Sequence, residues 1–77
     1  MKYYASTDIY AYHAIYPFCR ADIIVKSKSK RKKIIIRLYK KDTQQYVFSD
    51  FNFKSLISAV KSGFWRQIEE SEAALLS

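Results

Sequence analysis

The clearest hydrophobic pattern in the chain runs from Phe51 onward and predicts a helix. Its apolar residues recur at intervals of three and four, which places them on one face of a helix of 3.6 residues per turn. They are Phe53, Leu56, Ile57, Val60 and Phe64. Asp50 or Asn52 can cap the start by accepting a backbone N–H bond, and Ser62–Gly63 offers the left-handed position that ends many helices. We expect the apolar face of this helix to cover the core.

A second helical segment is allowed after Gly63, the only glycine of the chain. Its pattern is carried by Trp65, Ile68, Glu72, Leu75 and Leu76, with Glu69, Glu70 and Glu72 facing solvent. The pattern leaves open whether there are two separate helices or one kinked rod.

Upstream of residue 50 the pattern changes to the alternation of β-strands. Residues 34–39 alternate between two faces, and residues 45–48 follow after the polar connection 41–44, which predicts a hairpin. Residues 22–26 are a further expected strand, joined to Ile34 by the polar run 27–33. The predicted fold is α+β: a three- to four-stranded antiparallel meander, packed by one or two C-terminal helices.

Residues 3–20 fit two interpretations. A helix capped at residue 7 or 8 could carry one apolar face and end before Pro17. The same region also alternates as a strand would, at Tyr10, Tyr12, Ala14 and Tyr16. We favour a strand or an irregular extended segment, and the helical interpretation stays open.

The length and composition predict one small domain, residues 1–77. The chain is 49% hydrophobic and 17% aromatic, which supplies bulky area for a modest core. A single cysteine, Cys19, cannot form an intramolecular disulfide, which favours a reducing, cytoplasmic setting. No secretory segment opens the chain, and no apolar run reaches the roughly 18 residues of a membrane span. We therefore expect no membrane association.

The positive charge is concentrated in one part of the chain. The formal net charge is +7, and nine of the fourteen Lys and Arg residues fall between positions 26 and 41. At a hairpin tip the run 26–33 would splay its side chains outward and form a basic ridge with the following strand. The predicted partner-binding residues are Lys26, Lys28, Lys30, Arg31, Lys32, Lys33, Arg37, Tyr39, Lys40 and Lys41.

Such a ridge suits an acidic protein or ribonucleoprotein surface, or RNA or DNA directly. Six phosphate contacts would give a log-log salt slope of roughly −5. Tyr39 and Tyr46 could stack on unpaired bases. Two other interpretations of the lysine-rich run are a solubilising turn and a nuclear localisation signal.

Tyrosines crowd the N-terminal segment, five of them within the first sixteen residues. Most should pack in the core, but this is more than so small a core can easily bury, and tyrosine is common in interfaces. We therefore expect secondary partner contacts at Tyr10, Tyr12 and Tyr16.

Signatures of catalysis are sparse. The lone His13 and Cys19 carry no pattern that marks them as a base and nucleophile, and one His with one Cys cannot complete a four-ligand zinc site. A phosphate-cradling loop would need more glycines. We expect no enzymatic activity, no catalytic residue, no metal, no cofactor and no small-molecule substrate.

Part of the chain resembles a known family. Ile34-Ile-Ile-Arg37, Gln45-Tyr-Val-Phe-Ser49 and Leu56-Ile-Ser-Ala-Val-Lys-Ser-Gly-Phe-Trp65, with Gln67 and Glu69-Glu70 after them, follow one another as strand, strand and helix. In order and spacing this stretch is similar to the C-terminal half of small phage-encoded anti-CRISPR inhibitors of Cas nucleases. The resemblance implies a non-enzymatic single-domain protein that blocks a CRISPR effector by stoichiometric binding in the host cytoplasm.

One departure from that family concerns charge. The inhibitors are strongly acidic DNA mimics, whereas this chain is basic, so a target would be an acidic protein patch or the guide RNA. The leading hypothesis is an inhibitor or adaptor that docks on a Cas effector complex through the basic hairpin. Direct nucleic-acid binding is the alternative, and a structural role in a phage particle the third. The first is slightly favoured because no established nucleic-acid-binding signature is legible.

Overall fold

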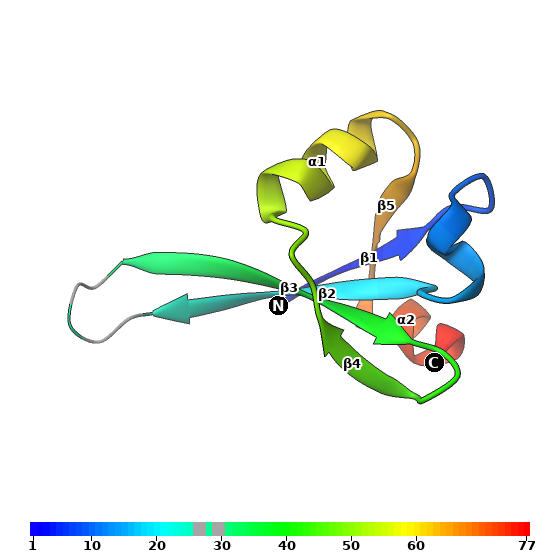
Figure 1. Cartoon of the computed structure of the whole chain (residues 1–77), viewed down its shortest axis with the longest axis horizontal. Coiled ribbons are helices and arrows are strands. Elements are labelled where there is room, and N and C mark those ends of the chain that lie inside the picture. The colour runs from blue at the N-terminus through cyan, green and yellow to red at the C-terminus, as the bar shows by residue number, and fades with distance from the viewer. Residues whose placement is uncertain (26–27, 29–30) are drawn as a thin grey trace.

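The computed structural model describes residues 1–25, 28 and 31–77. The described residues form five strands, two α-helices and a short 3-10 helix at Ala11–Ala14 (Figure 1). The strands run antiparallel in the order β4-β3-β2-β1-β5. The bounds are β1 Lys2–Ser6, β2 Phe18–Val25, β3 Lys32–Lys40, β4 Gln45–Phe48, α1 Phe53–Lys61, β5 Trp65–Ile68 and α2 Glu70–Leu76. The α+β prediction and the β2-β3-β4 meander are confirmed, with five strands in place of three or four.

Helix α1 covers one face of the sheet, as its apolar periodicity predicted. Asn52 caps the helix, because its side-chain oxygen accepts a bond from the Ser55 backbone N–H at 2.7 Å. The helix ends before Gly63, whose φ of 84° lies in the left-handed region. The core on this face consists of Tyr4, Cys19, Ala21, Ile36, Leu38, Leu56 and Trp65.

The opposite face of the sheet is covered in part by α2. A second cluster forms there from Ala5, Phe18, Tyr39, Ile68 and Ala73. Both faces therefore carry a core, and the helices lie on opposite sides of the sheet (Figure 1).

The predicted second helix is wrong for residues 65–68, which form β5 and pair with β1. In that pairing Ser6 lies opposite Trp65, and Tyr3 lies opposite Ile68. Trp65 and Ile68 are both buried but belong to different cores. In a helix, two residues three positions apart lie on one side. In β5 they lie on opposite faces of the sheet, and both faces are buried. The helix begins only at Glu70.

The N-terminal segment combines strands with one turn of helix. Residues 2–6 and 18–20 are extended, as favoured, but residues 11–14 form a 3-10 helix and do not alternate as a strand. The Tyr16 N–H donates to the Tyr12 carbonyl at the end of this turn. The turn reverses the chain between β1 and β2.

Strands β2 and β3 extend beyond their neighbours as a two-stranded arm. β1 pairs with β2 only up to Ala21, and β4 pairs with β3 only from Arg37. Residues 22–25 and 32–35 consequently pair only with each other. We call these residues, together with Lys28 and Arg31, the β-arm. It projects from the rest of the protein along the longest axis of the molecule (Figure 1), and the molecule with its arm measures 40 Å along that axis and 27 Å along the next. No helix among the described residues is long and apolar enough to cross a bilayer.

Candidate functional site

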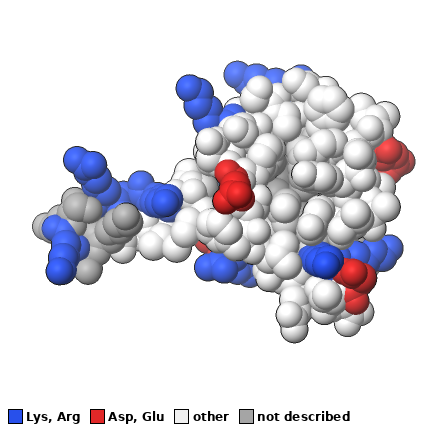
Figure 2. Space-filling model, in the orientation of Figure 1, with Lys and Arg blue, Asp and Glu red and all other residues white. Residues whose placement is uncertain are grey.

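The far half of the β-arm gathers four exposed cations: Lys28, Arg31, Lys32 and Lys33. Within the described part of the chain, none of them takes part in an ion pair. Figure 2 shows basic side chains at the far end of the arm and no acidic one beside them in this view. The structure thus brings these four predicted residues together. Lys26 and Lys30 lie outside the described residues.

The predicted ridge does not continue along β3. Lys40 lies at the opposite end of the strand from Lys32, about 26 Å away at the ordinary strand rise. Its Nζ atom is 3.8 Å from an Asp42 carboxylate oxygen, and the neighbouring Lys41 donates its backbone N–H to Ile15. The two lysines are a separate site, because a fully extended strand keeps its ends apart.

Tyr39 is not available as a stacking platform, contrary to the sequence prediction. Only 7% of the residue is exposed, and its ring is stacked on Phe18 at 4.6 Å. The register explains this burial, since Phe18 lies directly opposite Tyr39 on the face that α2 covers. Tyr46 is half-buried, and the Arg20 guanidinium lies 4.3 Å from its ring centre.

An ion triad lies at the base of the β-arm. Asp22 accepts bonds from Arg20 Nε at 2.8 Å and from Arg37 Nε at 3.1 Å. Burial lowers the pKa of Arg20, but the hydrogen bond and charge of Asp22 outweigh it and raise that pKa. Arg37 is therefore paired, and it does not belong to the cluster of unpaired cations.

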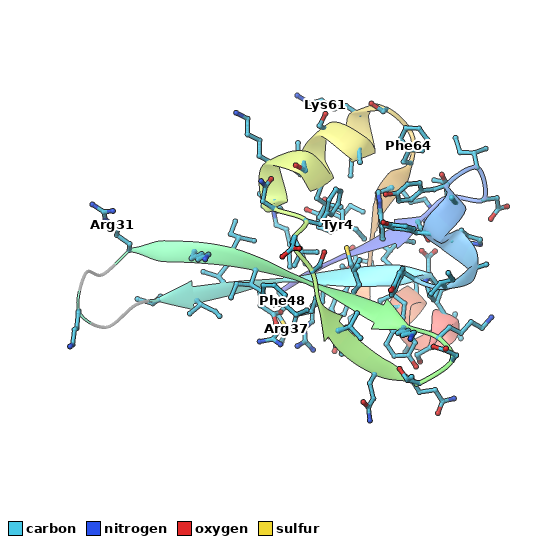
Figure 3. All side chains as sticks on the ribbon, viewed as in Figure 1. Tyr4, Arg31, Arg37, Phe48, Lys61 and Phe64 are labelled. Carbon is cyan, nitrogen blue, oxygen red and sulfur yellow. The ribbon has the colours of Figure 1, made fainter. Side chains whose placement is uncertain are left out.

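Beside the triad is a large exposed aromatic that the sequence prediction missed. Phe48 is 75% exposed and lies directly opposite Arg37 in the β3-β4 pairing. Figure 3 shows both residues near the base of the arm, with Arg31 at its far end. The alternation of β4 was a usable signal, because it directs Val47 and Phe48 to opposite faces.

The N-terminal tyrosines meet in a cleft of about 470 Å³. Tyr12 packs against Tyr10 at 5.0 Å and against Tyr16 at 5.4 Å between ring centres, and 46% of Tyr12 is exposed. The three residues predicted to make secondary partner contacts thus lie together, and the contacts themselves stay a prediction. Together with Phe51 of the β4-α1 loop and Trp65 of β5, these tyrosines form what we call the aromatic cleft: Tyr10, Tyr12, Tyr16, Phe51 and Trp65. Phe48 borders this cleft, but its side chain lies on the opposite face of β4 from Val47, which also lines the cleft.

His13 lies between a serine and an aspartate, an order reminiscent of hydrolase triads. Its Nδ1 atom is 3.1 Å from Ser6 Oγ, and its Nε2 atom is 3.0 Å from Asp8 Oδ1. Ser6 is only 3% exposed, however, and its hydroxyl donates to the Tyr16 carbonyl at 2.9 Å. The arrangement ties β1 to the 3-10 turn, and the hydroxyl has no access to a substrate.

The thiol of Cys19 is also shielded from solvent and reagents in the folded protein. The residue is fully buried, and burial raises the pKa of its thiol to about 12. The described residues contain no group of three or more His, Cys, Asp or Glu that could hold a metal ion. The chemistry that the surface offers is that of cations and aromatic rings.

Comparison of the chain with protein-family models, with curated proteins and with solved structures finds no match. The resemblance to anti-CRISPR inhibitors stays a prediction.

Proposed function

We propose that this is a non-enzymatic binding protein whose β-arm docks on the phosphate backbone of a nucleic acid, free or within a ribonucleoprotein. The observation that carries the proposal is a group of four exposed cations on a projecting ribbon. None of these four cations forms an ion pair with a described residue. A two-stranded ribbon is narrow enough to enter the major groove of a duplex. In Figure 2 the basic side chains at the far end of the arm lie apart from the acidic ones, so their positive field extends into solvent.

The strength of binding should depend steeply on salt. Each phosphate that a cation neutralises releases condensed counterion, with a log-log slope of about −0.7 on single strands and −0.9 on duplex DNA. Four contacts therefore predict a slope of about −3 to −4.

The test measures the affinity for a labelled duplex and a labelled single strand by fluorescence anisotropy, between about 50 and 200 mM salt. Two quadruple serine variants are compared with the native chain, and each lowers the formal net charge from +7 by four, to +3. The arm variant changes Lys28, Arg31, Lys32 and Lys33; the body variant changes Lys40, Lys41, Lys54 and Lys61.

The arm variant should lose most of the affinity and flatten the salt slope, while the body variant keeps the slope. Equal losses in the two variants would mean that only net charge matters, and the assignment to the arm would be wrong. If the native protein binds neither oligonucleotide at low salt, nucleic-acid docking is excluded.

Docking on a CRISPR effector, as an inhibitor encoded by a phage or other mobile element, is a second candidate. Beyond the family resemblance, it is supported by Arg37 and Phe48 at the base of the arm, because arginine and aromatic residues are enriched in protein interfaces. Its target would be an acidic protein patch or the guide RNA.

The test for this candidate adds purified protein in stoichiometric amounts to a panel of Cas effector complexes and measures target cleavage. Arg37→Gln should weaken inhibition. The matched control is Arg66→Gln, which removes an arginine that pairs with Glu72 at 2.8 Å on β5, away from the arm. Unchanged cleavage across the panel would contradict the second candidate.

A further inference from the structure

We propose that the aromatic cleft holds an unpaired nucleobase of a strand whose phosphates lie on the β-arm. The proposal rests on the proposed function and deepens it, because it predicts that single strands are preferred to duplexes. Bases stack on aromatic side chains irrespective of sequence, and proteins that bind single strands combine such rings with a basic track.

The lining of the cleft suits an aromatic ligand. Five aromatic residues contribute their rings to its wall, and one of them, Tyr12, is largely exposed, at 46%. The other rings are fixed by mutual packing: Trp65 lies 5.7 Å from Tyr10 and 6.3 Å from Phe51 between ring centres. A preformed aromatic wall loses little entropy when a base stacks on it.

Polar groups in the same wall match the edges of a base. Asp50 presents an exposed carboxylate, which can accept bonds from the exocyclic amino groups of adenine, cytosine or guanine. Trp65 is 1% exposed, and its indole N–H has no hydrogen-bond partner among the described residues. This wall residue therefore has a donor left unmatched, which is unusual for a buried indole.

A second, smaller cleft connects the β-arm to the aromatic cleft. Its volume is about 240 Å³, and it runs from Lys33 on the arm to the β4-α1 loop. The two clefts share Phe48, Ser49, Asp50 and Phe51. One strand could therefore contact Lys33 with its phosphate and place the next base or bases in the aromatic cleft.

The charge of the protein favours a nucleotide over the cationic groups that aromatic clefts also bind. An aromatic wall with one carboxylate would also suit a quaternary ammonium group. The molecule as a whole is strongly basic, however, and the smaller cleft is lined by Lys33, which pairs with no acid among the described residues. A ligand that carries phosphates is attracted to this region, whereas a cationic one is repelled.

Trp65 gives a direct readout, because it is the only tryptophan in the chain and lines the cleft. Its selectively excited emission is recorded while a short single-stranded DNA is added at low salt. An abasic strand of equal length is the matched ligand, since it has the same phosphates and no bases. We expect the emission to change with the normal strand and to stay constant with the abasic one.

Tyr12→Ala tests the exposed ring of the cleft, with Leu75→Ala as control. Leu75 is 86% exposed on α2, so its removal deletes exposed apolar area outside the cleft. Tyr12→Ala should weaken single-strand binding about 5- to 100-fold, as loss of one stacking contact does elsewhere. Affinity for a duplex and for the abasic strand should stay unchanged, as should every affinity of the control.

The outcomes distinguish failure of the cleft from failure of the arm. If normal and abasic strands bind equally, with no emission change and no effect of Tyr12→Ala, the base site is wrong while phosphate docking stands. If no strand binds, the proposed function itself fails. An emission change with choline, at concentrations where a mononucleotide gives none, would assign the cleft to a cation and overturn this inference.

Discussion

Arg20 and Arg37 lie directly opposite each other on β2 and β3, and both guanidinium groups donate to one carboxylate, that of Asp22. Two like charges at a cross-strand position repel unless an acid neutralises them. The acid sits where the β-arm leaves the body of the sheet. The triad therefore supports the root of the projecting ribbon.

The first prediction concerns this carboxylate. Asp22→Asn keeps the shape of the side chain and removes its charge, which leaves the two arginines unneutralised. We expect the free energy of unfolding in urea to fall by about 1 to 3 kcal/mol. Added salt should restore part of the loss, since it screens the arginine pair. Asp42→Asn is the control: that carboxylate is 69% exposed and its ion pair with Lys40 is long, so stability should hardly change.

The second prediction concerns Cys19. Because the thiol is fully buried and its pKa is raised to about 12, alkylating reagents should leave it unmodified at pH 8 in the folded protein and modify it in urea. Rapid modification of the native protein would contradict the burial.

The same pKa shift makes stability depend on pH in a definite direction. The thiol of the unfolded chain has a pKa near 9.0, so its contribution is complete below pH 9 and is lost as the pH rises from 9 towards 12. Urea unfolding at two pH values within that window checks this. The loss should be smaller in Cys19→Ala, and an equal loss in both proteins would refute the assignment.

The start of α1 gives a third prediction. Replacing Asn52 by alanine removes the acceptor for the Ser55 N–H and should destabilise the protein by about 1 kcal/mol in thermal or urea unfolding. Asn52→Asp retains an acceptor at the same position and should stay close to the native stability. Equal loss in the two variants would show that the cap is unimportant.

Gly63 gives a fourth. A Cβ atom there would meet no atom within 4 Å, so the effect of Gly63→Ala reports backbone conformation alone. At a φ of +84° alanine should lower the free energy of unfolding by about 1 to 2 kcal/mol. Ser62→Ala, at an ordinary φ of −86°, is the neighbouring control and should have little effect. A neutral Gly63→Ala would argue against the left-handed geometry.

Local signals in the sequence were enough for the meander and for α1. The apolar periodicity of α1, the cap and the single glycine are all effects of neighbouring residues. They predicted the end at Ser62–Gly63 and left Asp50 and Asn52 as candidates for the cap, whereas Phe64, which the pattern included, lies beyond the helix. β5 could not be recognised in this way. Its four residues pair with β1 at the other end of the chain, and that tertiary contact overrides a spacing that also fits a helix.

The charged part of the candidate site could be predicted from the sequence. The aromatic part could not, because it depends on which face of the sheet each helix covers. The cations of the β-arm cluster in sequence, so their proximity in the hairpin follows. Tyr39 was predicted to stack on bases because it shares the sheet with the cations, and the sequence does not reveal which face of the sheet a second helix covers. Helix α2 packs on the other face of the sheet, where Tyr39 is buried, but it does not cover Phe48.

The two strands of the β-arm have one more consequence, which concerns self-association. A ribbon with both outer margins unpaired is a template on which another copy could polymerise, and Ile23 and Val25 are exposed along it, at 62% and 57%. Lys32 and Lys33 give every copy the same positive sign, so two ribbons repel each other before their backbones can meet. A polyanion that neutralises these lysines also removes this protection, and we expect insoluble assemblies to form in mixtures where the polyanion just balances the positive charge.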